Sequence, residues 1–93
     1  GKARVKFKNK SFDEAKIIFQ ELLDTNYKPA TINYYLGEIH YYQKKYFLAI
    51  KFYKASVSPY SQSPFMPTLL LHSGISLEKT KNNKEAKSFF KSL

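Results

Sequence analysis

Apolar side chains recur three or four positions apart in three segments of this chain, which is the spacing of a helix with one buried face. The segments SFDEAKIIF, KYFLAIKFY and NNKEAKSFF span residues 11–19, 45–53 and 82–90 and align without gaps. Each has an alanine at its centre and an aromatic residue four positions later. The alanines are Ala15, Ala49 and Ala86. A frame that recurs in register predicts an internal repeat.

A glycine stands twelve residues before the second alanine and again before the third. These glycines, Gly37 in YYLGEIHYY and Gly74 in LHSGISLEK, interrupt segments that otherwise favour a helix. A glycine inside a helix costs about 1 kcal/mol relative to alanine. The absence of its side chain should therefore permit a close contact between helices that offsets this cost. We expect close packing of Gly37 with Ala49 and of Gly74 with Ala86, where small residues let two helix backbones approach.

The three alanines are 34 and then 37 residues apart. A period of about 34 residues is that of the tetratricopeptide repeat, a helix–turn–helix unit, and this chain resembles that family over nearly its whole length. The resemblance implies an all-α fold of antiparallel helix pairs, stacked as a short right-handed solenoid of about 2.5–3 repeats. We expect a single domain over residues 1–93, cut from a longer protein, with repeats at about 1–27, 28–60 and 61–93.

Helix start signals and prolines set the expected boundaries. Ser11 and Glu14 have the spacing of a capping box, which predicts a helix over about 12–24, and Asn82 and Glu85 repeat this spacing before a helix over about 83–92. Residues 1–10 are expected to end a leading helix. Further helices are expected over about 30–43, over about 46–57, and from Ser63 or Pro64 to about 79. The proline-rich SVSPYSQSPFMP is predicted to form a longer connection.

The formal net charge of +9 leaves two interpretations of the surface. The basic and aromatic segment KKYFLAIKFYK, at 44–54, is compatible with a nucleic-acid strip with stacking rings. However, Arg4 is the only arginine, and arginine makes most specific forks to bases and phosphates. The aromatic residues of this segment also fall at helical packing positions. We therefore expect a solvated lysine face and no nucleic-acid partner, and we keep nucleic-acid binding as the alternative.

Side chains that could carry out chemistry are sparse. The chain has no cysteine, which excludes disulfides and thiolate metal sites, and no apolar run reaches the roughly 18 residues of a membrane span. His40 and His72 are interpreted as packed histidines of leading helices, because neither has a carboxylate cluster beside it in the sequence. We expect no enzymatic activity, no catalytic residue, no cofactor and no metal.

The leading helices of stacked repeats line a groove, and counting from Ala3, Gly37 and Gly74 indicates which side chains face it. The residues predicted to bind a protein there are Arg4, Phe7, Lys8, Thr31, Tyr34, Glu38, Tyr41, Tyr42, Thr68, Leu71, Ile75, Glu78 and Lys79. Tyrosines combine apolar area with a hydroxyl and are good anchors. Repeat domains that clamp a terminal carboxylate place asparagine directly after the glycine. Glu38 and Ile75 stand at that position here, so a chaperone C-terminus is not the expected ligand.

The region from NYYLGEIHYY to the end of the chain resembles the C-terminal repeat domain of the YbgF family, also called the cell division coordinator CpoB. The matching motifs are YLGE at 35–38, Ser-Pro-x-x-Pro at 63–67, GISL at 74–77 and KEA at 84–86. The Tyr-Pro pair that the family often places before the linker is inverted here, as Pro59-Tyr60.

This resemblance implies a protein-interaction module in the bacterial periplasm that binds TolA of the Tol–Pal system. Such a module links peptidoglycan synthesis to outer-membrane constriction during cell division. The resemblance also implies a homotrimer through an upstream coiled coil and a peptidoglycan synthase as a further partner. Because no heptad seam occurs in these 93 residues, the excised domain is expected to be monomeric. A repeat scaffold of outer-membrane protein assembly is a second alternative.

Overall fold

The computed structural model describes residues 1–57, 63–81 and 84, and this part of the chain contains helices and no strand. The helices are α1 (Lys2–Lys8), α2 (Phe12–Asp24), α3 (Pro29–Tyr42), α4 (Tyr46–Val57) and α5 (Met66–Thr80). The expected all-α class is confirmed. No helix among these described residues is long and apolar enough to cross a membrane.

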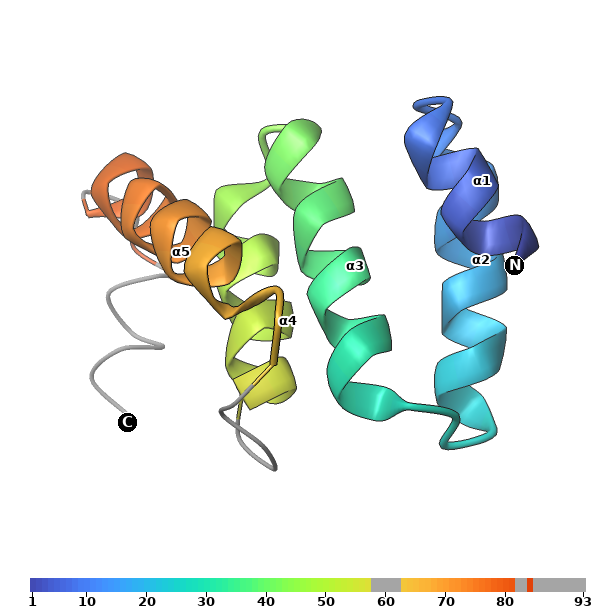
Figure 1. The fold of residues 1–93 in the computed structure, drawn as a ribbon. Coiled ribbons are helices and arrows are strands. Elements are labelled where there is room, and N and C mark those ends of the chain that lie inside the picture. Colours follow the sequence, from blue (N-terminus) through green and yellow to red (C-terminus); the bar gives the residue numbers. More distant parts are fainter. Residues whose placement is uncertain (58–62, 82–83, 85–93) are drawn as a thin grey trace.

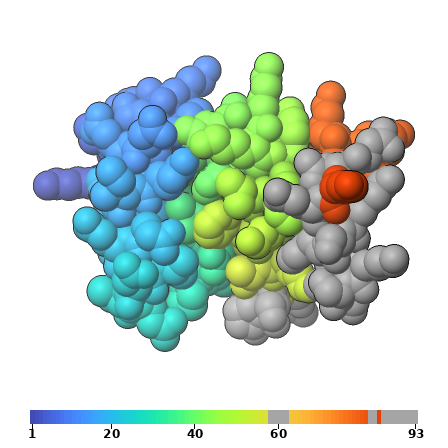
Figure 2. Space-filling view, turned by 180° about the vertical axis from the view of Figure 1, so that it is seen from behind, coloured from blue at the N-terminus to red at the C-terminus, as the bar shows by residue number. Residues whose placement is uncertain are grey.

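The helices form two layers (Figure 1). Helices α1, α3 and α5 lie in one layer, with α2 and α4 behind them. Each helix packs against the next one in sequence, and α3 also packs against α5. Figure 2, seen from behind, shows the chain crossing the molecule from one side to the other in sequence order. Alternate helices therefore share a layer, and α3 has neighbours on both sides.

The expected boundaries agree closely with three of these helices. Helices α2 and α4 have the predicted ends, and α3 begins and ends one residue earlier than predicted. Helix α5 begins at Met66, later than expected, because Phe65 is its N-cap and a proline, whose fixed φ suits a helix start, occupies its first turn. The helix expected over 83–92, apart from Lys84, and residues 58–62 of the predicted connection lie outside the described residues.

The capping box predicted before α2 does not form, although the helix begins where the motif indicates. Ser11 makes no side-chain capping hydrogen bond. Glu14, its predicted partner, pairs instead with Lys6 of α1 at 2.7 Å. Asp13 and Glu14 still place negative charge in the first turn, where it is favourable to the helix dipole.

The turns α1–α2 and α3–α4 have the same backbone geometry. Lys10 and Lys44, 34 residues apart, have left-handed φ angles of 61° and 63°. In each turn the lysine N–H donates to a carbonyl three residues back at 3.0 Å, and the next N–H donates to one five residues back at 2.8 Å. This is the Schellman motif, which satisfies the last carbonyls of a helix and is usually built with glycine. The α1–α2 and α3–α4 hairpins are therefore closed in the same way.

Gly37 is buried where α3 meets α4. A β-carbon on Gly37 would stand 2.6 Å from each of two ring carbons of Tyr53, closer than real carbon contacts allow. The missing side chain therefore makes room for a tyrosine ring, and Tyr53 fills the space that we expected Ala49 to share. Ala49, one turn earlier on α4, is fully buried.

Gly74 has a different environment. It is exposed, and no described atom lies within 4 Å of the position its β-carbon would take. The close packing predicted for Gly74 is therefore not found within the described part of the chain. Its predicted partner, Ala86, lies outside that part.

Two groups of buried apolar side chains form the core. The first joins α1, α2 and α3 around Phe19, Leu36 and Ile39. The second joins α4 to α5 around Tyr53 and Leu69. Helix α3 contributes to both, since Tyr34 and Tyr41 pack against the second group. The central position of α3 decides which of its side chains remain available for a ligand.

Candidate functional site

The carboxylate of Glu38 lies at the junction of three helices and is only 3% exposed. The hydroxyl of Tyr34, one turn earlier on α3, donates to Oε1 at 3.2 Å. The hydroxyl of Tyr53 on α4 donates to Oε2, and Nδ1 of His72 on α5 lies 2.6 Å from the same oxygen. We call these four residues the Glu38 cluster. A buried carboxylate without partners would cost several kcal/mol, and here three donors surround it.

Two tyrosines of the Glu38 cluster hold their protons strongly. Burial, together with the hydrogen bond and charge of Glu38, raises the pKa of Tyr53 far above its ordinary value of 10.0. Burial and the same carboxylate raise the pKa of Tyr34. Both hydroxyls therefore remain donors over the physiological pH range. The three donors around Glu38 are side chains of α3, α4 and α5. The carboxylate therefore joins these three helices.

Ring contacts strengthen the same junction. The ring of Tyr34 stacks on Phe65, which caps α5, with centroids 4.3 Å apart and planes within 9°. The ring of Tyr41 stacks on His72 with centroids 4.0 Å apart. Stacked aromatic pairs contribute about 0.5–1.5 kcal/mol beyond their buried area. Tyr34 and Tyr41 thus fasten α5 onto α3, each with one ring face occupied.

This arrangement corrects part of the groove prediction. Glu38 is buried rather than open to a ligand, and Tyr34 and Tyr41 are only partly accessible. The physical reason is that counting positions along one helix predicts which side chains share a face. It does not predict which other helix packs on that face. Helix α5 lies on the face of α3 that we assigned to a ligand.

The other predicted groove residues divide among three separate hollows. One hollow lies along α5 and includes Leu71, Ile75, Glu78 and Lys79. A second, at the end of α1, includes Phe7, Lys8 and Tyr42. A third, between α1, α2 and the start of α3, includes Arg4 and Thr31. Thr68 is exposed on α5 and lines none of these three.

Two members of the Glu38 cluster were missed from the sequence. From the sequence, His72 has no carboxylate cluster beside it, and Tyr53 has only a packing role. Glu38 and His72 are 34 residues apart, which is one repeat length. Since neighbouring leading helices lie side by side, a pairing at that separation was the signal that could have identified them.

His40 has the packing role that we expected. Its Nδ1 lies 2.7 Å from the Leu36 carbonyl, to which it donates, and its ring stacks on Phe52 with centroids 4.9 Å apart. Burial is the main cause that lowers the pKa of His40, with Lys16 and Lys45 adding to the shift. The imidazole is therefore neutral at neutral pH.

Over residues 1–57, 63–81 and 84, no three histidine, aspartate or glutamate side chains are grouped so that they could hold a metal ion. Comparisons with protein-family models, curated proteins and solved structures found no match.

Proposed function

We propose that this chain is a non-enzymatic protein-binding module built of tetratricopeptide repeats that stack as a right-handed solenoid. Three features support the repeat assignment. The turns at Lys10 and Lys44 are 34 residues apart and have the same hydrogen bonds. Leading helices alternate with second helices between two layers. Gly37 admits an aromatic ring from the second helix of its hairpin.

The surface that we propose for the partner lies on the open side of the leading helices. Its principal support is the outer side of α5, where Leu70 and Leu71 are 62% and 61% exposed and share a hollow with Ile75. Tyr42, at the end of α3, is 52% exposed. Exposed leucines beside a hollow and a partly free tyrosine are the kind of side chains that anchor protein interfaces.

The partner that we propose is TolA, and this identity rests on the resemblance to the YbgF/CpoB family. On that proposal the protein acts in the periplasm, within the Tol–Pal system, during cell division. Trimerisation through an upstream coiled coil and contact with a peptidoglycan synthase belong to the same proposal.

The experiment measures the affinity of a TolA fragment for variants whose substituted side chains are similarly exposed to solvent. Leu71→Ala and Tyr42→Ala should each weaken binding by about 1–3 kcal/mol, as anchor residues do. Ile17→Ala is the control, because Ile17 is equally exposed, at 62%, but lies on α2 in the other layer. If the three variants bind like wild type, the proposed surface is wrong. If wild type itself fails to bind TolA, the partner is wrong while the repeat assignment stands.

Nucleic-acid binding remains the second candidate because of the excess of lysine. Its signature would be an affinity that falls by about 0.7–0.9 log units per phosphate contact for each decade of salt. TolA binding through Leu71 and Tyr42 should depend much less on salt, because apolar anchors dominate that surface. A repeat scaffold of outer-membrane assembly would show neither TolA binding nor this salt dependence.

A further inference from the structure

The two matching turns and the C-terminal end of α5 lie at the same end of the molecule (Figure 1). Each of these places contributes exposed lysines. They are Lys8 and Lys10 at the α1–α2 turn, Lys44 and Lys45 at the α3–α4 turn, and Lys79 in the last turn of α5. We call these five residues the lysine edge.

The charge of the lysine edge is not neutralised by nearby carboxylates. Within residues 1–57, 63–81 and 84, none of its five members makes an ion pair. The neighbouring carboxylates are already engaged, since Glu14 pairs with Lys6 and Glu78 pairs with Lys81. Asp13 accepts a hydrogen bond from Gln43 at 3.2 Å. The edge therefore presents five positive charges, none of which is in an ion pair with a described carboxylate.

Other groups in the molecule respond to this charge. Burial and the positive charge of Lys45 lower the pKa of Lys16, which lies on α2. Lys45 also contributes to the lowered pKa of the buried His40. Such a concentration of like charge costs stability unless something outside the chain offsets it.

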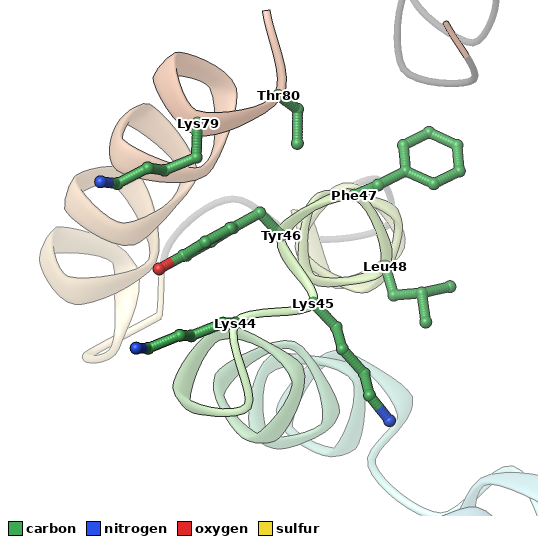
Figure 3. A pocket seen from close by; sticks show the side chains of 7 residues that line it. All are labelled: Lys44, Lys45, Tyr46, Phe47, Leu48, Lys79 and Thr80. Carbon is green, nitrogen blue, oxygen red and sulfur yellow. The ribbon is translucent and has the colours of Figure 1, made fainter. Parts of the chain in front are cut away.

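A hollow of about 330 Å³ opens within the lysine edge, lined by Lys44, Lys45 and Lys79 together with Tyr46, Phe47, Leu48 and Thr80. Figure 3 shows the side chains of Lys44 and Lys79 on the same side of the hollow, with the Tyr46 hydroxyl between α3 and α5, while Lys45 points away toward α2. Two ammonium groups and a phenolic hydroxyl can all donate to one carboxylate.

We propose that the lysine edge binds an acidic segment of a protein partner, with a glutamate or aspartate side chain of that segment in the hollow beside Lys44, Tyr46 and Lys79. This edge adjoins the leading-helix face, because Lys79 also lines the hollow along α5, so a partner could contact either surface or both.

Ring contacts favour an acidic peptide over a single-stranded nucleic acid. A base stacks on a free ring face, and two rings near this edge already have one face engaged within the molecule. Tyr42 stacks on Phe12, with planes within 8°. Lys51 lies over the ring of Phe47, 5.7 Å from its centroid. Lysines are also point charges, without the planar fork with which arginine holds phosphate.

The test uses three fluorescent probes: a short peptide of alternating glutamate and glycine, a serine–glycine peptide of equal length, and an oligothymidine. Anisotropy titrations at two salt concentrations compare Lys44→Gln/Lys79→Gln with Lys2→Gln/Lys28→Gln. The second variant loses the same charge away from the edge, at the start of α1 and at the α2–α3 connection. Circular dichroism establishes that both variants are folded.

We expect the glutamate peptide to bind wild type and the serine–glycine peptide not to bind. Lys44→Gln/Lys79→Gln should weaken glutamate-peptide binding about three- to tenfold, as the loss of two exposed ion pairs would, and reduce its salt dependence. Lys2→Gln/Lys28→Gln should change it by less than about twofold. Equal losses of affinity in the two variants would show that the peptide is attracted by net charge alone. That result would overturn the proposed site. Tighter binding of oligothymidine than of the glutamate peptide would overturn the proposed class of partner.

Discussion

Tyr53 packs its ring against the backbone of Gly37 while its hydroxyl donates to the side chain of the next residue on α3, Glu38. The ring is therefore held along one side by α3 and at its tip by the carboxylate. Tyr53 is also only 1% exposed, so it has no solvent to move into. A side chain that is fixed at two points cannot easily give way to an added atom.

Gly37→Ala should therefore destabilise the protein. The added methyl group overpacks a closed contact, at a cost of about 1–3 kcal/mol or more. Alanine's better helix propensity returns about 1 kcal/mol, so we expect a net loss of up to about 2 kcal/mol. Urea unfolding at neutral pH measures the difference.

Gly74→Ala supplies the matched control on α5. Because no described atom lies near the new methyl group, the propensity gain should dominate and stabilise the protein by up to about 1 kcal/mol. Destabilisation by Gly74→Ala would instead support the Gly74–Ala86 contact that the repeat frame predicts.

Ala49→Leu should also destabilise the protein, because Ala49 is fully buried between packed helices. Three further carbon atoms would push α4 away from its neighbours, at a cost of about 1–3 kcal/mol. Lys51→Ala, on the exposed side of the same helix, should change the free energy of unfolding by no more than about 0.5 kcal/mol. Thermal melts that fail to separate these variants would contradict the assigned packing face of α4.

Glu38→Gln tests whether the Glu38 cluster joins the three helices. The amide is similar in shape but keeps only one acceptor oxygen and introduces NH₂ donors beside groups that themselves donate. We expect a loss of about 1–3 kcal/mol in the free energy of unfolding. Glu78→Gln makes the same chemical change at an exposed residue of α5 paired with Lys81 and should cost less than about 0.5 kcal/mol.

Stability should fall as the pH drops below about 6.5, the ordinary pKa of histidine. Burial lowers the pKa of His40, so the unfolded chain takes up this proton at a higher pH than the folded protein does. The unfolded state then binds more protons, and by linkage folding weakens as the pH decreases through this range. The contribution of His40 to the free energy of unfolding is fully present above about pH 6.5.

Unfolding free energies measured on either side of pH 6.5 test this dependence. His40→Phe keeps an aromatic ring against Phe52 but cannot take up a proton, so the loss on acidification should become smaller. An unchanged loss in this variant would assign the acid sensitivity to other groups.

Stability should also fall above about pH 10, where the unfolded tyrosines ionise but Tyr34 and Tyr53 keep their protons. Tyr34→Phe should reduce this alkaline loss, whereas Tyr27→Phe, at a side chain 49% exposed, should leave it in place. Equal alkaline losses in wild type and Tyr34→Phe would show that Tyr34 does not contribute.

The helix boundaries were predictable because they depend on local signals. The alanine–aromatic frame and the helix start at Ser11 located α2 and α4, and Pro29, the first residue of α3, located its first turn. The start of α5 was less predictable. The segment SPFMP has several helix-start signals in succession, and the sequence alone does not rank them.

The Glu38 cluster could not be predicted in the same way, because it depends on three helices meeting. The periodicity placed Glu38 and Tyr34 on one face of α3, and the hydrogen bond between their side chains confirms that they share it. Which residues of α4 and α5 reach it depends on how the helices cross and on how the fold accommodates the three extra residues of the second interval. Both are properties of the folded molecule rather than of any one segment.

The pairing of Glu38 with His72 limits how the units of this chain could be exchanged. An α3–α4 hairpin taken alone would leave its carboxylate hydrated, with no need for a histidine. Placing a foreign helix in the position of α5 would remove that water and leave the buried carboxylate with only the Tyr34 and Tyr53 hydroxyls as donors. The missing third donor is unfavourable by about 1–3 kcal/mol. A chimera that keeps Glu38 must therefore bring a hydrogen-bond donor at position 72, and a designer who replaces α5 freely should first make residue 38 apolar.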